Sequence, residues 1–340
     1  MTAGVNRRVL LARRPVGMPT EDDFEMVEAP VPEPGAGQAL VRALYLSLDP
    51  YMRGRMNAGP SYAAPVALGE VMVGGVVGEV VASHTPALEV GDIVEGPLGW
   101  QDYALSDGRD VRKVDPASAP ISTALGILGM PGLTAYFALL DLGRPRAGDT
   151  VVVSAAAGAV GATVGQIARL KGCRVIGIAG SAAKIDYITG ELGFDRGIDY
   201  KATDDLGAAV ADACPRGVDV YFDNVGGATS WTVFEHLAVG ARIVVCGAIS
   251  QYNLAAPEVG PRNLRFMLVK RARMAGFLVF DYENRYAEGR ARLAEWLRDG
   301  KLRYREDVVE GLENAVGGFL RLMRGENFGK VVVRVGGERR

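Results

Sequence analysis

The sequence predicts an α/β protein in which a doubly wound parallel sheet is joined to an irregular antiparallel β barrel. From residue 150 onward, short apolar strands alternate with helices, which is typical of a parallel sheet covered on both faces. Before residue 150, short β-rich runs are broken by turn residues, and 14 of the 17 prolines lie there. That pattern indicates antiparallel strands. A length of 340 residues favours two domains over one.

The first 150 residues contain the elements of the predicted barrel. Residues 39–46 and 76–81 are β-rich runs, and proline and glycine turns such as 30–35 separate runs of this kind. A later segment, 126–140, is apolar and contains Pro131 and Gly132. We expect a buried helix there, opened by these two residues, because proline is tolerated in the first helical turn. This helix would join the two regions.

The most informative stretch is residues 150–184, TVVVSAAAGAVGATVGQIARLKGCRVIGIAGSAAK. Residues 151–153 predict a buried strand, 162–170 a helix, and 174–178 a second buried strand. The turn between the first strand and the helix consists of Gly158, Ala159, Val160 and Gly161. Strand, glycine turn, helix and strand within about thirty residues form the fingerprint of a dinucleotide-binding βαβ unit.

The glycines of this turn have separate physical roles. Gly158 permits backbone to approach a ligand pyrophosphate, where a side chain would keep it away. Gly161 lets the start of the helix lie close to the first strand, and the N–H groups of that helix start favour an anion. Ala156 replaces the first glycine of the usual GxGxxG motif. The assignment therefore depends on the flanking strands as much as on the glycines.

The end of the second strand indicates which dinucleotide is bound. NAD-specific sites place Asp or Glu there to hold the ribose 2′-hydroxyl, whereas this chain has Ala179, Gly180 and Ser181, followed by Lys184. A small loop with a hydroxyl and an ammonium group suits a 2′-phosphate. We therefore predict NADP(H) as the cofactor. The alternative is that Lys184 only begins a solvent-facing helix.

The α/β alternation continues to the end of the chain. Further strands are predicted at 197–200, 218–223, 241–246, 274–280 and 330–335. Helices are predicted at 182–192, 204–213, 229–237, 286–297 and 308–323. A ligand of a doubly wound sheet lies at the carboxyl ends of its strands, where Asn224, Cys246 and Ala248 fall in this sequence.

Composition excludes several classes of protein. A net charge of −2 and 49% hydrophobic residues are not those of a nucleic-acid-binding or disordered chain. The sequence has neither a signal-peptide pattern nor an apolar run long enough to span a membrane. Its three cysteines form no paired framework, so we expect a reducing, cytoplasmic location.

Metal binding is not expected either. A catalytic zinc ion needs about three protein ligands, and a structural one often uses four cysteines. The chain has only two histidines, His84 and His236, and its cysteines are far apart in sequence. The simplest interpretation of both histidines is that they are surface polar residues.

Specific runs along the chain carry a family resemblance. They are DPYMRGRM (49–56), LGMPGLTAYF (128–137), SAAAGAVGATVGQIARLKGCRVIGIAGS (154–181), YFDNVGG (221–227), CGAISQYN (246–253) and GENFGK (325–330). In these runs the chain resembles zinc-free medium-chain dehydrogenases/reductases of the prostaglandin reductase and alkenal double-bond reductase group, which includes bacterial curcumin reductase-like enzymes. The runs span essentially the whole sequence in order.

The resemblance implies a domain organisation and a set of site residues. It implies a GroES-like domain at 1–127, completed by 301–340, around a Rossmann domain at 128–300, in a homodimer. The NADP-contacting positions of the family fall here on Lys184, Tyr200, Asn224, Cys246 and Asn327. The family's tyrosine near the nicotinamide falls on Tyr252, and a second tyrosine on the substrate side, found in some members, falls on Tyr51.

The predicted chemistry is reduction of an activated carbon–carbon double bond in an α,β-unsaturated ketone or aldehyde. The protein would donate a hydrogen bond to the developing oxyanion and supply a proton. Tyr252 is the first candidate for these roles and Tyr51 the second; the alternative for either is packing over the nicotinamide pocket. Two other functions remain open: an NADPH quinone reductase on the same scaffold, or a non-catalytic NADPH-binding protein that senses redox state.

Overall fold

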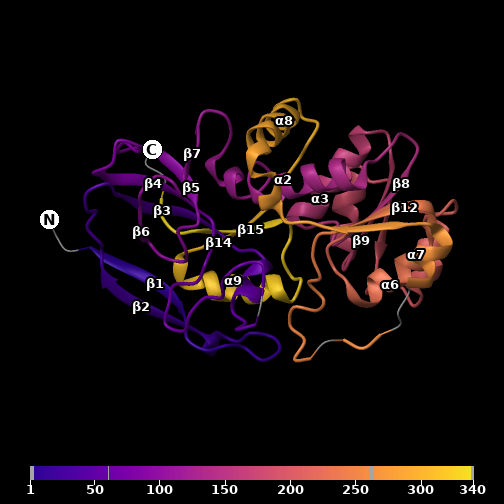
Figure 1. Ribbon diagram of the computed structural model, residues 1–340, viewed down its shortest axis with the longest axis horizontal. Helices are drawn as coiled ribbons and strands as arrows, with labels where there is room; N and C mark the ends of the chain where they lie inside the picture. Colours follow the sequence, from indigo (N-terminus) through magenta and orange to yellow (C-terminus); the bar gives the residue numbers. More distant parts are fainter. Residues whose placement is uncertain (1–3, 60, 257, 261–263, 338–340) are drawn as a thin grey trace. The chain divides into compact units, whose positions relative to one another are not determined.

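The computed structural model describes residues 4–59, 61–256, 258–260 and 264–337 (Figure 1). Its internal contacts divide the chain into two compact units. Unit 1 comprises Met1–Gly126 and Glu306–Arg340, and unit 2 comprises Ile127–Arg305. Unit 1 is thus made of two separate segments of the sequence, whereas unit 2 is one continuous segment. Among the described residues, no helix is long and apolar enough to cross a membrane.

Unit 2 contains a six-stranded sheet in which all paired strands are parallel. In spatial order its strands are β10 (Arg196–Asp199), β9 (Arg174–Ala179), β8 (Thr150–Ser154), β11 (Val218–Asp223), β12 (Leu237–Val245) and β13 (Arg273–Gly276). The central strand β8 is fully buried, as its run of valines predicts. The strand order reverses between β8 and β11. In sheets of this kind, that point opens a crevice at the carboxyl ends of the strands.

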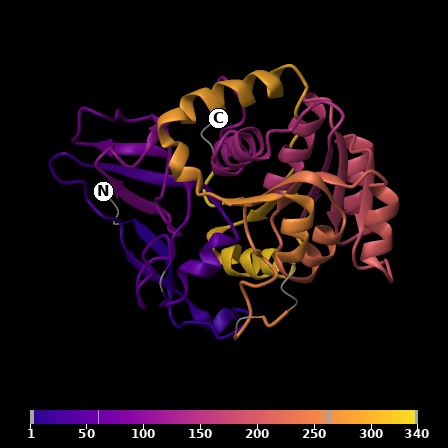
Figure 2. The same cartoon turned by 45° about the vertical axis from the view of Figure 1, so that its right-hand side comes forward.

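Helices cover both faces of this sheet. They are α2 (Met130–Phe137), α3 (Ala159–Leu170), α4 (Ala182–Asp186), α5 (Leu206–Ala213), α6 (Gly227–Glu235), α7 (Leu264–Lys270) and α8 (Tyr286–Arg298). In Figure 1, α2, α3 and α8 lie above the strands, and α6 and α7 lie below them. The packing of α8 over α2 is also seen in Figure 2. Residues on one side of α3, among them Val164 and Ile167, are completely buried because that side faces the sheet.

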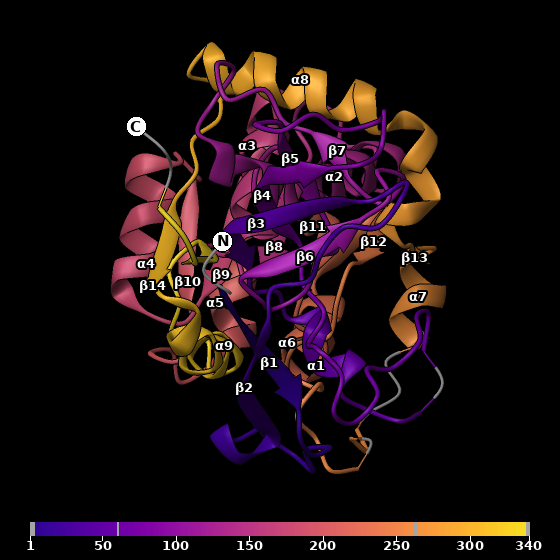
Figure 3. The same cartoon turned by 90° about the vertical axis from the view of Figure 1, so that its left-hand side faces the viewer.

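Unit 1 is built on a seven-stranded, mainly antiparallel sheet and a separate hairpin. The sheet contains β3 (Ala39–Ser47), β4 (Val76–Ser83), β5 (Ile93–Gly96), β6 (Tyr103–Ser106), β7 (Arg112–Lys113), β14 (Glu306–Glu310) and β15 (Lys330–Arg334). The hairpin pairs β1 (Val5–Leu11) with β2 (Phe24–Pro30). Figure 3 shows β3 between β4 and β6. The short helix α1 (Tyr51–Arg55) follows β3.

The C-terminal part of the chain completes the sheet of unit 1. Strand β15 lies between β14, with which it is parallel, and β3, with which it is antiparallel. Helix α9 (Ala315–Met323) connects β14 to β15, and its Phe319 packs edge-on against Trp100 at a ring separation of 5.8 Å. Trp100 also stacks on Phe24 at 5.9 Å. The core of unit 1 therefore depends on residues from both ends of the sequence.

The predicted fold class is confirmed, with two corrections to individual elements. The helix expected at 308–323 begins only at Ala315, because residues 306–310 form strand β14. Val308 and Val309 are β-branched residues that pair with β15, which explains the strand. The strand expected at 274–280 ends at Gly276 and is followed by a 3₁₀ helix, Val279–Arg285.

Candidate functional site

The turn between β8 and α3 brings backbone close to the start of the helix. A Cβ atom on Gly161 would lie 2.4 Å from the carbonyl oxygen of Ala155, so this position requires glycine. A Cβ atom on Gly158 would meet only that same oxygen, at 3.2 Å, among the described residues. Gly161 therefore serves packing within the protein, whereas the partly exposed Gly158 is less crowded. Ala159 and Val160 form the first turn of α3, which has no side-chain cap at Gly158.

The carboxyl ends of β9 and β10 bring together four predicted site residues. Ser181 caps α4 by accepting a hydrogen bond from the N–H of Lys184 at 3.3 Å. The ring of Tyr200 lies against Gly180, since a Cβ atom there would be 2.8 Å from the Tyr200 ring. Tyr200 is 47% exposed, so its ring also faces solvent. This corner of the sheet combines a hydroxyl, an ammonium group and an aromatic face.

Asp223, at the end of β11, is the centre of a buried hydrogen-bond network. Its carboxylate accepts hydrogen bonds from the hydroxyl of Tyr221 at 3.0 Å and from the N–H groups of Val225 and Gly226, each at 3.0 Å. The hydroxyl of Ser230 donates a further hydrogen bond to it. These bonds satisfy a carboxylate that is only 4% exposed. They hold the turn after β11 in one conformation.

Asn224 connects the ends of the two strands at the point where the strand order reverses. Its side-chain amide donates to the carbonyl oxygen of Ser154 at 2.8 Å, and its backbone N–H donates to the Ser154 hydroxyl oxygen at 2.9 Å. Ser154 ends β8, and Asn224 directly follows β11. This pair therefore fixes the floor of the crevice expected between these strands.

The segment after β12 continues the same edge of the sheet. The N–H of Cys246 donates to the backbone oxygen of Asp223 at 2.8 Å. Burial raises the pKa of the Cys246 thiol to about 12, so the thiol stays protonated near neutral pH and is not a thiolate nucleophile. The half-buried Tyr252 folds back, and its phenol oxygen accepts a hydrogen bond from the N–H of Ala248 at 3.3 Å.

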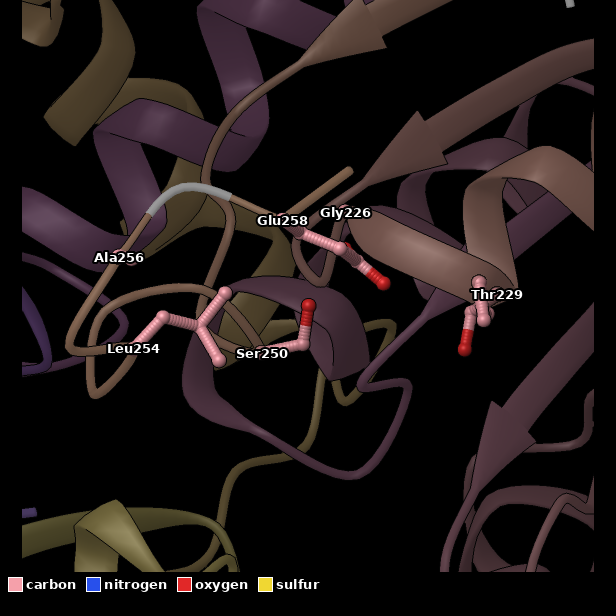
Figure 4. A pocket seen from close by; sticks show the side chains of 7 residues that line it. Gly226, Thr229, Ser250, Leu254, Ala256 and Glu258 are labelled. Carbon is pink, nitrogen blue, oxygen red and sulfur yellow. The ribbon is translucent and has the colours of Figure 1, made fainter. Parts of the chain in front are cut away.

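A cavity of about 280 Å³ lies beside the turns that follow β11 and β12. Its lining combines small, polar and apolar residues, namely Gly226, Ala228, Thr229, Ser250, Leu254, Ala256 and Glu258. Figure 4 shows the side chains of Leu254 and Ser250 on one loop, with Thr229 at the start of α6. None of the predicted site residues lines this cavity.

The two remaining predicted site residues belong to unit 1. Tyr51 begins α1 and is half-buried; burial, followed by the charge of Asp49, raises the pKa of its phenol well above the usual value. Asn327 is 9% exposed, and its side-chain amide donates to the carbonyl oxygen of Gly329 at 3.0 Å. The amide of Asn327 is thus held by the turn that leads into β15.

Sequence reasoning identified the residues at this edge of the parallel sheet but missed those that support them. Asp223, Tyr221 and Ser230 form the network under Asn224, and none of them was among the predicted site residues. The available signal was an aspartate at the end of a buried strand, directly before Asn224 and two glycines. A buried carboxylate needs several donors nearby, and the following turn supplies them.

The described residues include no cluster of three or more His, Cys, Asp or Glu side chains that could hold a metal ion. All three cysteines are free thiols. The donor set of these residues therefore does not fit a protein-held zinc ion.

Two sequence families match the chain. The family described as "N-terminal domain of oxidoreductase" matches residues 7–114, in unit 1. The family described as "Zinc-binding dehydrogenase" matches residues 159–295, in unit 2. The second description refers to zinc, which contrasts with the donor set found among the described residues.

Individual relatives are similar over nearly the whole chain. A putative NADP-dependent oxidoreductase of Bacillus subtilis is 53% identical, with 98% of this chain and 99% of the relative covered. The NADPH-dependent curcumin reductase of Escherichia coli is 49% identical, with 98% of each chain covered. The crystal structure of CurA from Vibrio vulnificus in complex with NADPH has a TM-score of 0.94 and 49% identity, covering 98% of this chain and 100% of that one.

Proposed function

Because the chain belongs to the medium-chain dehydrogenase/reductase family, in the group of the curcumin, prostaglandin and 2-alkenal reductases, we propose that it uses NADPH to reduce the carbon–carbon double bond of α,β-unsaturated ketones or aldehydes. The observation that carries this proposal is the 49% identity to an NADPH-dependent curcumin reductase over 98% of both chains. The arrangement of residues in unit 2 supports the binding of NADPH, and the position of Tyr252 supports its role as a hydrogen-bond and proton donor.

The residues at the carboxyl edge of the sheet fit NADPH. Gly158 has no side chain to hold a ligand away from its backbone, and the start of α3, which has no side-chain cap, offers N–H groups to a pyrophosphate. No carboxylate occupies 179–181, and Lys184 with Tyr200 supplies a cation and a ring for the phosphorylated adenosine. Asn224, Cys246 and Ala248 follow neighbouring strands of the same sheet. The family resemblance also implies Asn327 as a contact of the cofactor.

Replacing Lys184 by alanine is expected to weaken NADPH binding about tenfold and leave NADH binding unchanged. The loss corresponds to one charge-assisted contact to the 2′-phosphate, about 1.5 kcal/mol. Fluorescence titration of each nucleotide measures both dissociation constants. Lys171→Ala is the matched control. Lys171 caps the C-terminal end of α3, away from the glycine turn, and its replacement is expected to change neither dissociation constant. Equal weakening of both nucleotides by Lys184→Ala would contradict the 2′-phosphate assignment.

The residues of the chain have a defined task in this reaction. Bound NADPH supplies the hydride for the β-carbon of the substrate. The protein must then hold the enolate oxygen and provide a proton for the α-carbon. The phenol of Tyr252 is a neutral O–H donor that is placed by its bond to Ala248. The phenol of Tyr51, whose pKa is raised, also remains protonated and is the second candidate.

The experiment that tests this function is a substrate survey with the purified protein. NADPH oxidation would be followed spectrophotometrically with small alkenals, cyclic enones, long-chain enones such as curcumin, and quinones. We expect turnover of enones or alkenals, with products that retain the carbonyl group and lack the double bond. Preferential turnover of quinones would favour a quinone reductase. Tight NADPH binding without any turnover would favour a redox-sensing protein.

We also propose that the protein forms a homodimer through unit 2. Strand β13 is an edge of the parallel sheet, and edges of this kind are usually covered. Exposed apolar side chains lie on and near it: Met274 is 44% exposed, Leu268 on α7 is 79% exposed, and Phe280 is 61% exposed. A second copy of the chain would cover both the edge and these side chains.

Leu268→Asp is expected to convert the dimer into a monomer without unfolding it, because Leu268 is mostly exposed within one chain and a buried carboxylate at an interface is costly. Light scattering during size-exclusion chromatography measures the mass. Val308→Asp is the control, since Val308 lies on β14, an edge strand of the other sheet, and is 38% exposed. A Leu268→Asp variant that remains dimeric would place the interface elsewhere.

A further inference from the structure

A buried ion pair in unit 1 joins two segments that carry predicted site residues. The ammonium group of Lys330 lies 3.1 Å from the carboxylate of Asp49, and the two residues are 5% and 6% exposed. Asp49 is separated from Tyr51 by a single proline. Lys330 lies three residues after Asn327, in the run GENFGK. The pair therefore connects the backbone before Tyr51 to the turn that holds Asn327.

The hydrogen-bonding capacity of Lys330 is fully used by this connection. An ammonium group has three N–H donors. Its partners are the carboxylate of Asp49 at 3.1 Å, the carbonyl oxygen of Leu48 at 2.8 Å and the carbonyl oxygen of Val331 at 2.8 Å. With all three protons engaged, Lys330 has none left for a substrate. Its contribution to a reaction must therefore be made through the groups that it holds.

Of the two carboxylates near Lys330, Asp49 is the one that forms the ion pair with it. Asp49 also accepts a hydrogen bond from the hydroxyl of Ser47. Glu306 faces Lys330 in the register of β14 and β15, but it accepts a hydrogen bond from the Ser122 hydroxyl at 2.9 Å, and burial raises its pKa. Burial lowers the pKa of Lys330, whereas Asp49 raises it. The charge of Asp49 in turn acts on the nearby phenol of Tyr51.

We propose that Lys330 is a positioning residue for the reductase reaction: by binding Asp49 and the carbonyl oxygen of Leu48, it fixes the backbone that places the phenol of Tyr51. This inference rests on the proposed function, in which Tyr51 lies on the substrate side. It assigns a role to the last residue of the GENFGK run, which the cofactor contact of Asn327 does not explain.

A double-mutant cycle tests whether Lys330 acts through Tyr51. The variants are Lys330→Met, Tyr51→Phe and the combination, and the measured quantity is kcat/KM for an enone with saturating NADPH. We expect Tyr51→Phe to lower kcat/KM about tenfold in the native background and less than about twofold in the Lys330→Met background. A residue that only stabilises the fold would leave the effect of Tyr51→Phe unchanged.

The matched control is Arg42→Met. Arg42 forms a partly buried ion pair with Glu79 in the same sheet, at 2.7 Å. In this background, Tyr51→Phe is expected to keep its full tenfold effect. Because Lys330→Met leaves the Asp49 carboxylate buried without its cation and so threatens folding, the double variant Asp49→Asn/Lys330→Met removes both charges while nearly preserving side-chain size. It is expected to show the same reduced effect of Tyr51→Phe.

A second readout needs no turnover. In spectra of protein labelled with carbon-13 at the tyrosine ζ carbon, the signal of Tyr51 is assigned by its loss in Tyr51→Phe. We expect that signal to move in both Lys330 variants and to stay in place in Arg42→Met. The inference is overturned if Tyr51→Phe changes kcat/KM equally in all backgrounds or does not change it in the native one. It is also overturned if the Tyr51 signal stays in place in the Lys330 variants. If the native protein reduces no enone, the proposed function fails, and the signal alone decides whether Lys330 positions Tyr51.

Discussion

Replacing Tyr252 by phenylalanine is expected to lower kcat for enone reduction about a hundredfold while leaving the dissociation constant of NADPH nearly unchanged. The substitution removes the phenol O–H of Tyr252, whose oxygen accepts a hydrogen bond from the N–H of Ala248. Loss of a proton donor or oxyanion donor typically costs this much. The aromatic ring remains, so the proposed packing of this side chain against the cofactor is retained. Steady-state kinetics and fluorescence titration measure the two quantities separately.

Tyr304→Phe is the control for this prediction. Tyr304 belongs to the same unit and is 36% exposed. It lies between α8 and β14, and not in a turn directly after a strand of the parallel sheet. We expect its kcat to equal that of the native protein. An unchanged kcat in Tyr252→Phe would reduce Tyr252 to a packing residue and leave Tyr51 as the remaining candidate.

Gly161→Ala is expected to lower both the stability of the protein and its affinity for NADPH. The new methyl group would lie 2.4 Å from the carbonyl oxygen of Ala155, so the start of α3 must move away from the turn. Overpacking of this kind costs about 2–3 kcal/mol of the free energy of unfolding, and it displaces the N–H groups that would face the pyrophosphate. Urea denaturation and nucleotide titration measure the two effects.

Gly158→Ala separates ligand contact from protein packing. Gly158 has a φ angle of −79°, which alanine adopts readily, and a Cβ atom there meets only one described atom, at 3.2 Å. We expect the free energy of unfolding to change by less than about 1 kcal/mol, while NADPH affinity falls at least about tenfold, because the methyl group would occupy space needed by the pyrophosphate. Unchanged affinity would show that the cofactor does not approach this backbone.

Unit 2 could be predicted from the sequence because its signals are local. The run of valines in β8 is too short for a helix and fully buried, and glycines mark the turn into α3. Strands of a parallel sheet are buried on both faces, so each is a short, nearly continuous apolar run in the sequence. The prediction of NADP(H) was local as well, because it rests on the lack of an acid at 179–181 and on Lys184 just after them.

The errors and omissions concern features that depend on distant residues. Residues 306–310 pair with β15; their two β-branched residues favour a strand, but the pairing partner is not visible in the local sequence. The network around Asp223 includes Ser154, which is 69 residues away in sequence. The same holds for Lys330 and Asp49, which are separated by most of the chain. Pairing at such distances is a property of the fold and not of any one segment.

The position of β15 has a consequence for the order in which the two units can fold during synthesis. This strand lies inside the sheet of unit 1, between β14 and β3, although β3 ends at Ser47 and β15 begins only at Lys330. Unit 2, being continuous, can fold while translation is still in progress, whereas the sheet of unit 1 stays incomplete until residues 330–334 have been synthesised. A prematurely terminated chain that stops at Gly329 would consequently lack an internal strand and is expected to aggregate.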